Sequence, residues 1–185
     1  EDALEDPRVH ISNMDAFKFL MNNNAKYDVI IIDLPDPTSE SIARLYSNAF
    51  YKLVMKALTP DGVFVTQATS PELTTNAFWC IEKTISNLGF HWVAYHVNVP
   101  SFGNWGFVMG MLADRMRLQF DQNIEMKFLE DGILQHLLYF PKDKRMKSIL
   151  PNNLDNPILL DYYLDHLPFV GLKFNIHLHS LKAQF

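Results

Sequence analysis

Two aspartates three residues apart are the part of this sequence best suited to chemistry. Asp33 and Asp36 follow the apolar run 29–32 and alternate with prolines in Asp33-Leu34-Pro35-Asp36-Pro37. Because proline lacks an amide donor and restricts the residue before it, this stretch is expected to be a stiff turn rather than the start of a helix. Two carboxylates held in this way form an acidic site suited to a cationic ligand. The alternative is that both only cap a turn.

The strand before this turn decides where the two acids lie. Val29 to Ile32 are apolar and β-branched without alternation, which is typical of a central strand covered on both faces of a parallel sheet. In open α/β sheets, ligands bind beyond the carboxyl ends of the strands. The sequence therefore predicts a site at that rim, with both aspartates in it.

Strand-like and helix-like segments alternate along the rest of the chain. Strands are expected at 9–12, 29–32, 63–67, 91–99 and 106–112, and helices at 14–21, 39–58 and 70–88, with a turn at 59–62. Alternation requires right-handed parallel crossovers, whereas the last two strands, joined by about six residues, must be antiparallel. We therefore predict an α/β fold with a Rossmann-like sheet, mostly parallel, with helices on both faces and an antiparallel final strand at its edge.

The composition changes after residue 117. Residues 1–117 are expected to form the sheet domain, and 118–173 a helical carboxyl-terminal extension packed on it, with short helices at 131–139 and 157–167. The last segment, 174–185, fits neither pattern and is left as an uncertain tail.

Composition and charge restrict the class of protein. The 185 residues are 48% hydrophobic and carry a net charge of -5, with no basic run, which argues against nucleic acid or an anionic membrane as the main partner. Cys80 is the single cysteine, and no metal-ligand spacing is present, so no metal site is expected. The histidines are scattered, and we expect them at the surface or satisfied in the core. No apolar run approaches the ~20 residues that span a bilayer.

Four stretches of the sequence resemble one known family in order and spacing. They are Asp33 to Pro37, Leu45 to Lys56, Leu58 to Gln67, and Asn153 to Pro157. The first is similar to the Asp-x-x-Asp-Pro signature of the polyamine aminopropyltransferases, the spermidine and spermine synthases. The Leu-Pro-Asp-Pro form and the loop 101–107 most resemble bacterial members with a membrane-spanning region ahead of the enzyme domain. The resemblance thus implies a carboxyl-terminal part of a catalytic domain, cytoplasmic or at the cytoplasmic face of a membrane.

The resemblance implies transfer of an aminopropyl group from decarboxylated S-adenosylmethionine to a primary amine such as putrescine, giving spermidine and methylthioadenosine. Both substrates are cationic, and no permanently bound cofactor is implied. Exposing the lone pair of an alkylamine of pKa ~10.4 at pH 7 costs ~4.6 kcal/mol unless a base accepts the proton. Asp33 is the candidate general base and Asp36 the anchor of the cationic amine. Positioning for in-line displacement is the main catalytic effect expected.

The resemblance also implies which residues bind the aminopropyl donor and which bind the amine. Asp15 and Ala16 resemble the family's pair that contacts the adenine, and Leu45 would line the adenine pocket. The alternatives are a helix N-cap for Asp15 and a core position for Leu45. Gln67 resembles the family's amine-site glutamine, or else is a satisfied residue at the rim.

The loop 101–107 departs from the family. Phe102 stands where the family commonly has a tyrosine, so it is expected at the substrate site without the contact of that hydroxyl. Trp105 is expected to bind substrate there too and to supply the aromatic wall instead. Two other functions therefore stay open. One is a methyltransferase that uses S-adenosylmethionine with its carboxylate intact. The other is a non-catalytic oligomerisation or regulatory module of the same fold.

Some parts of the family pattern have no counterpart. They are the glycine-rich turn after the first strand, the acid after the second, and the amino-terminal β-hairpin domain, so the sheet, of class I methyltransferase type, is expected to lack its first two strands. The chain is then a fragment, expected to be inactive alone. Segment 29–32 would become an open edge. We predict that 9–12 moves in beside it or that a homodimer forms across it, unless residues ahead of Glu1 fill the gap.

Overall fold

The computed structural model describes residues 3–114, 121, 123–127, 129–146 and 148–165. Its sheet has four strands, β1 (Tyr27–Ile32), β2 (Leu58–Gln67), β3 (His91–Val99) and β4 (Gly103–Met111), in the order β1-β2-β4-β3. The segment 174–185, expected to be an uncertain tail, lies outside the described residues.

Three of the strands run in the same direction. β1 pairs with β2 in parallel, and β4 is antiparallel to both β2 and β3, so only β4 is reversed. The prediction of a mostly parallel sheet with an antiparallel final strand is confirmed. The expected place of the reversed strand is wrong, because β4 lies between β2 and β3 and leaves β3 at the edge.

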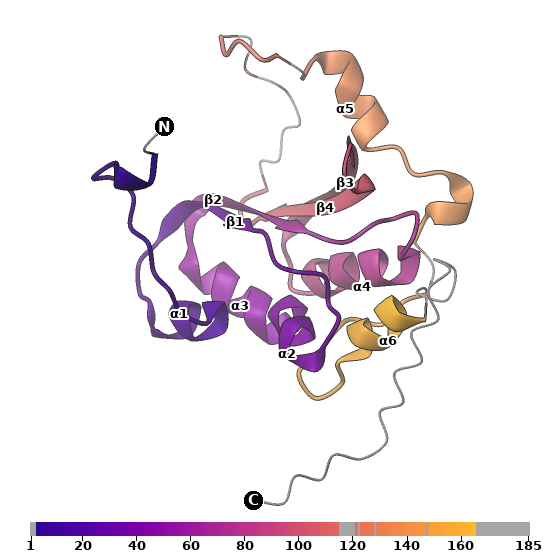
Figure 1. Ribbon diagram of the computed structural model, residues 1–185, viewed down its shortest axis with the longest axis horizontal. Helices are drawn as coiled ribbons and strands as arrows, with labels where there is room; N and C mark the ends of the chain where they lie inside the picture. The colour runs from indigo at the N-terminus through magenta and orange to yellow at the C-terminus, as the bar shows by residue number, and fades with distance from the viewer. Residues whose placement is uncertain (1–2, 115–120, 122, 128, 147, 166–185) are drawn as a thin grey trace, which may run out of the picture.

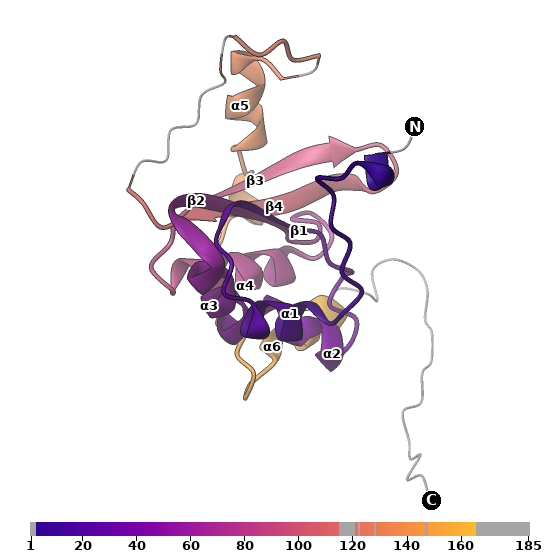
Figure 2. The same ribbon diagram turned by 90° about the vertical axis from the view of Figure 1, so that its left-hand side faces the viewer.

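The described helices gather mainly on one face of the sheet. They are α1 (Ala16–Asn22), α2 (Glu40–Ala43), α3 (Asn48–Ala57), α4 (Thr75–Ser86) and α6 (Ile158–Leu164), and Figures 1 and 2 show them below the strands. In the same views, α5 (Asp131–Leu137) stands apart from them beside β3. In this part of the chain, no helix combines the length and hydropathy needed to cross a bilayer.

The core forms where the amphipathic helices meet that face. In the segment expected to be a helix at 39–58, Tyr46, Phe50 and Val54 are at most 2% exposed. Its helix is interrupted, however, because Ser47 adopts an extended conformation that ends the short 3-10 helix Arg44–Tyr46. The Ser47 hydroxyl then accepts a hydrogen bond from the Phe50 amide at 3.3 Å and so caps α3.

Segment 9–12 does not form the expected strand. Val9 and Ile11 are 41% and 70% exposed, and the Val9 amide donates a turn hydrogen bond to the carbonyl of Asp6 at 2.8 Å. The prediction that this segment moves in beside β1 is therefore wrong. Within the described ranges, β1 pairs with β2 alone, and a homodimer across its free edge stays a prediction.

β1 is also less covered than its sequence indicates. Ile32 is 7% exposed on the helix side, but Val29 and Ile31 on the opposite face are 58% and 75% exposed. The prediction of a central strand covered on both faces is wrong for the described residues, because nothing among them packs over that face of β1. The expected turn at 59–62 is also wrong, since β2 begins at Leu58.

Asn152 ties α6 to the rest of the helical layer. Its side chain is fully buried, donates to the Ala43 carbonyl at 2.8 Å, and accepts from the Leu159 amide at 3.3 Å. Its own amide donates to the Thr84 hydroxyl at 2.8 Å. Because buried polar groups are costly when unpaired, these bonds fix where α6 begins relative to α2 and α4.

Gly106 allows α4 to approach β4 closely, and its replacement by alanine should be costly. A Cβ there would lie 2.4 Å from the Phe78 ring and 2.9 Å from the Thr69 carbonyl oxygen. We expect Gly106→Ala to lower the free energy of unfolding by about 1–3 kcal/mol, because the packed ring and backbone must shift. Chemical denaturation measures this. Gly132→Ala in α5, where a Cβ would contact nothing within 4 Å, is the control and should be neutral or stabilising.

Candidate active site

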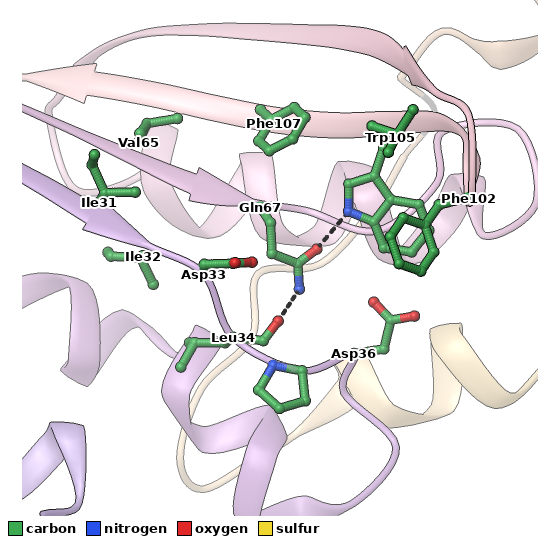
Figure 3. A pocket seen from close by; sticks show the side chains of 12 residues that line it. Ile31, Ile32, Asp33, Leu34, Asp36, Val65, Gln67, Phe102, Trp105 and Phe107 are labelled. Atoms are coloured by element: carbon green, nitrogen blue, oxygen red, sulfur yellow. Dashed lines mark hydrogen bonds between the residues drawn. The ribbon is translucent and has the colours of Figure 1, made fainter. Parts of the chain in front are cut away.

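A cavity of about 630 Å³ opens at the carboxyl ends of β1 and β2, where the sequence places the site. It is lined by Ile31, Ile32, Asp33, Leu34, Pro35, Asp36, Val65, Gln67, Val99, Phe102, Trp105 and Phe107. The structure therefore brings together the predicted general base and all four predicted amine contacts (Figure 3). The two acids come from the turn after β1, and the aromatic residues come from β4 and the loop before it.

The two aspartates differ in their surroundings. Asp33 directly follows β1, is exposed, and points toward Gln67 in Figure 3. Asp36 is half-buried, and its Oδ2 accepts a hydrogen bond from the Tyr163 hydroxyl at 2.8 Å. Its Oδ1 is buried and has no hydrogen-bond partner among the described residues. Burial raises the pKa of Asp36, and the neighbouring Tyr163 hydroxyl and Gln67 amide offset part of that rise.

The side-chain amide of Gln67 has all its hydrogen-bonding positions occupied by other groups of the protein. Its Nε2 donates to the Leu34 carbonyl at 2.7 Å and to the Tyr46 hydroxyl. Its Oε1 accepts from the Thr69 amide at 2.9 Å and from the Trp105 indole at 3.2 Å. Two donor hydrogens and two acceptor positions are all that a glutamine amide has. Gln67 thus links the turn after β1 to β4, and the geometry agrees with the satisfied rim residue left open as the alternative.

Trp105 and Phe102 form the aromatic side of the cavity. Their ring centroids are 5.5 Å apart, and the Phe102 ring is 64% exposed. Gly103, with a φ of +77°, makes the tight connection between β3 and β4 possible. Because the Trp105 indole donates to Gln67, its ring plane is held at the cavity wall.

The three residues predicted to contact the aminopropyl donor, Asp15, Ala16 and Leu45, lie outside this cavity. Asp15 caps α1 by accepting from the Lys18 amide at 3.0 Å, and its other oxygen pairs with the guanidinium of Arg44. The hydrogen bond from Lys18 is the largest of the causes that lower the pKa of Asp15. Ala16 and Leu45 pack against the hydrophobic core. In the described part of the chain, Asp15 is therefore a helix N-cap and Leu45 packs with the core, which are the alternatives stated for these two residues.

Two tyrosines of the site were not predicted. Tyr46 is fully buried and donates to the Pro35 carbonyl at 3.0 Å, and Tyr163 donates to Asp36. The sequence placed them only within the helices expected at 39–58 and 157–167. A buried tyrosine hydroxyl needs a partner, which is the one signal that could have identified them.

None of the histidines that the structure describes lines this cavity. His96 is buried, and its Nδ1 and Nε2 lie 2.7 Å from Asn104 Oδ1 and 2.8 Å from the Tyr139 carbonyl oxygen. His10, His91 and His136 are exposed, while His166 lies outside the described residues. Within that part of the chain, no group of three or more His, Cys, Asp or Glu side chains could hold a metal ion.

The fold and the position of the cavity define a Rossmann-like α/β protein of the methyltransferase type, with its ligand site at the carboxyl ends of the strands. The family model described as the spermine/spermidine synthase domain matches residues 1–122. The chain belongs to the spermine/spermidine synthase family.

Curated relatives and solved structures agree with this membership. The chain is 39% identical to polyamine aminopropyltransferase 1 of Streptomyces coelicolor over 168 residues, covering 89% of this chain and 32% of that protein. It is 41% identical to the polyamine aminopropyltransferase of Oceanobacillus iheyensis over 170 residues, covering 88% and 33%. A crystal structure of spermidine synthase in complex with the transition state analogue AdoDATO superposes with a TM-score of 0.65 at 25% identity, covering 76% and 50%.

The chain spans about a third of the length of these curated relatives and half of the solved synthase.

Proposed function

We propose that the intact protein transfers an aminopropyl group from decarboxylated S-adenosylmethionine to a primary amine such as putrescine. One observation carries the proposal: the two carboxylates of the family signature lie together in an aromatic-walled cavity, and one buried oxygen of Asp36 has no partner in the described part of the chain. A buried acceptor of this kind is suited to the ammonium group of an amine. The relatives named polyamine aminopropyltransferases support the choice of reaction.

The residues of the cavity divide the chemistry between them. Asp36 holds the cationic end of the amine, and Asp33 accepts a proton from the attacking nitrogen. The nitrogen then bonds to the aminopropyl carbon next to the sulfonium, the bond from that carbon to sulfur breaks, and neutral methylthioadenosine leaves. Because the leaving group loses its charge, no acid is needed to protonate it. The protein's main contribution is to align the three atoms.

The remaining predicted residues keep proposed roles. Phe102 and Trp105 form a wall for the alkyl chain of the amine, and Gln67 keeps Leu34, and with it Asp33 and Asp36, in place. Asp15, Ala16 and Leu45 are the proposed contacts of the donor's adenine. Membrane attachment through a region outside this sequence, a cytoplasmic location and a homodimer also remain predictions.

The test is an assay of the intact protein with decarboxylated S-adenosylmethionine and putrescine. Formation of methylthioadenosine together with spermidine is expected. Turnover with S-adenosylmethionine and none with its decarboxylated form would identify a methyltransferase instead. If calorimetry detects no binding of methylthioadenosine and neither donor is consumed, the protein is a non-catalytic module of the same fold.

A further inference from the structure

The contact between Tyr163 and Asp36 joins two distant parts of the chain. The Tyr163 hydroxyl donates to Asp36 Oδ2 at 2.8 Å across 127 positions of sequence. Tyr163 is 8% exposed and lies on α6, whereas the family model ends at residue 122. A residue outside the matched domain therefore contacts a carboxylate of the family signature.

This hydrogen bond sets the orientation of the Asp36 carboxylate. A hydroxyl that donates to a carboxylate makes a short, charge-assisted bond, which selects one side-chain rotamer of the acid. With Oδ2 engaged in this way, Oδ1 remains as the buried acceptor without a partner in the described residues. Leaving such an oxygen without a hydrogen bond is costly, so we expect Oδ1 to accept one from a donor outside this part of the chain.

Tyr163 is itself held firmly. α6 is anchored to the helical layer through Asn152, whose side chain accepts from the Leu159 amide and donates to the Ala43 carbonyl. Leu159, one helical turn before Tyr163, is fully buried. Burial and the neighbouring Asp36 raise the pKa of Tyr163, so the phenol stays neutral and remains a hydrogen-bond donor.

We propose that Tyr163 is a positioning residue for the amine substrate, which acts by holding Asp36 through Oδ2 so that Oδ1 receives the ammonium group. The proposal rests on the proposed function. It makes the helical extension, through α6, a part of the amine site rather than only a cover for the core. Tyr163 need not touch the amine itself, because it acts through Asp36.

The test compares Tyr163→Phe with Tyr162→Phe in the intact protein. Both variants lose one phenolic hydroxyl from the same helix. Among the described residues, the Tyr162 hydroxyl makes one long hydrogen bond, which it accepts from the Leu150 amide at 3.5 Å. Tyr163→Phe is expected to raise KM for putrescine by about 10-fold, because a hydrogen bond to a charged group is lost. KM for decarboxylated S-adenosylmethionine should change less than twofold in either variant. Thermal unfolding confirms that both variants fold.

A second measurement follows Asp36 directly. Carboxyl carbon NMR of the intact protein should show the titration of Asp36 moving to higher pH in Tyr163→Phe and staying in place in Tyr162→Phe, because the ionised carboxylate loses a donor only in the first. The acid limb of the pH profile of kcat/KM for putrescine should move in the same direction.

The inference is overturned if the two variants have equal KM for putrescine, or if the Asp36 titration does not move. If the wild type consumes no decarboxylated donor, the proposed function fails, while the titration still decides whether Tyr163 controls Asp36.

Discussion

Replacing Asp33 by asparagine in the intact protein is expected to lower kcat for aminopropyl transfer by about 10³-fold, within the 10²–10⁴-fold range of general base catalysis. Asparagine has the same shape but cannot accept the proton of the amine at neutral pH. The ~4.6 kcal/mol needed to deprotonate an alkylamine at pH 7 is then no longer supplied by the enzyme. KM for the donor should change little, since only the base is removed.

Asp28→Asn is the matched control for this experiment. Asp28 is an exposed acid at the amino-terminal end of the same strand, where it accepts a hydrogen bond from the Thr59 hydroxyl at 2.9 Å. It lies outside the cavity, so its replacement should leave kcat unchanged. If Asp33→Asn turns over like the wild type and like Asp28→Asn, Asp33 is not the base.

The second large effect concerns the stability of the fold rather than its chemistry. Glu82 on α4 is fully buried, and neither of its carboxyl oxygens has a hydrogen-bond partner in the described residues. Burial raises its pKa from 4.5 to about 7. Between those two pH values, the folded protein keeps a proton that the unfolded chain has lost. The free energy of unfolding must therefore fall as the pH rises through this interval, by at most about 3 kcal/mol.

Glu82→Gln should remove this dependence on pH. The neutral amide cannot ionise, so at about pH 8 the variant should be more stable than the wild type, and at about pH 5 the advantage should vanish. Urea unfolding at the two pH values measures the difference. Glu125→Gln, at an exposed position, is the control and should follow the wild type at both. Parallel pH profiles for Glu82→Gln and the wild type would show that Glu82 is not the group responsible.

The turn that carries the two acids was predictable because its causes are local. Prolines at 35 and 37 prevent a helix from starting, and an apolar β-branched run before them forms a strand in most sheet contexts. Since ligand sites lie beyond the carboxyl ends of such strands, the place of the cavity followed as well. The antiparallel relation of β3 and β4 was equally local, because a short connection permits no crossover.

Other properties depend on how separate elements of the structure pack and pair with one another. The apolar pattern of β1 indicates a strand buried on both faces, yet Val29 and Ile31 are exposed, because burial depends on neighbours that the pattern does not specify. Segment 9–12 has the composition of a strand but pairs with no other strand in the described residues. A strand requires a partner to satisfy its backbone, so composition alone could not decide this case.

The sequence by itself determined which residues would meet at one place in the fold, since Asp33, Asp36, Gln67, Phe102 and Trp105 line one cavity. Only the tertiary structure decided how they are held. Gln67 has its amide satisfied within the protein, and Asp36 is oriented by Tyr163 from 127 positions away. Periodicity and motif spacing report contacts within an element, whereas these contacts arise when separate elements pack together. Such partners are therefore visible only once the chain is folded.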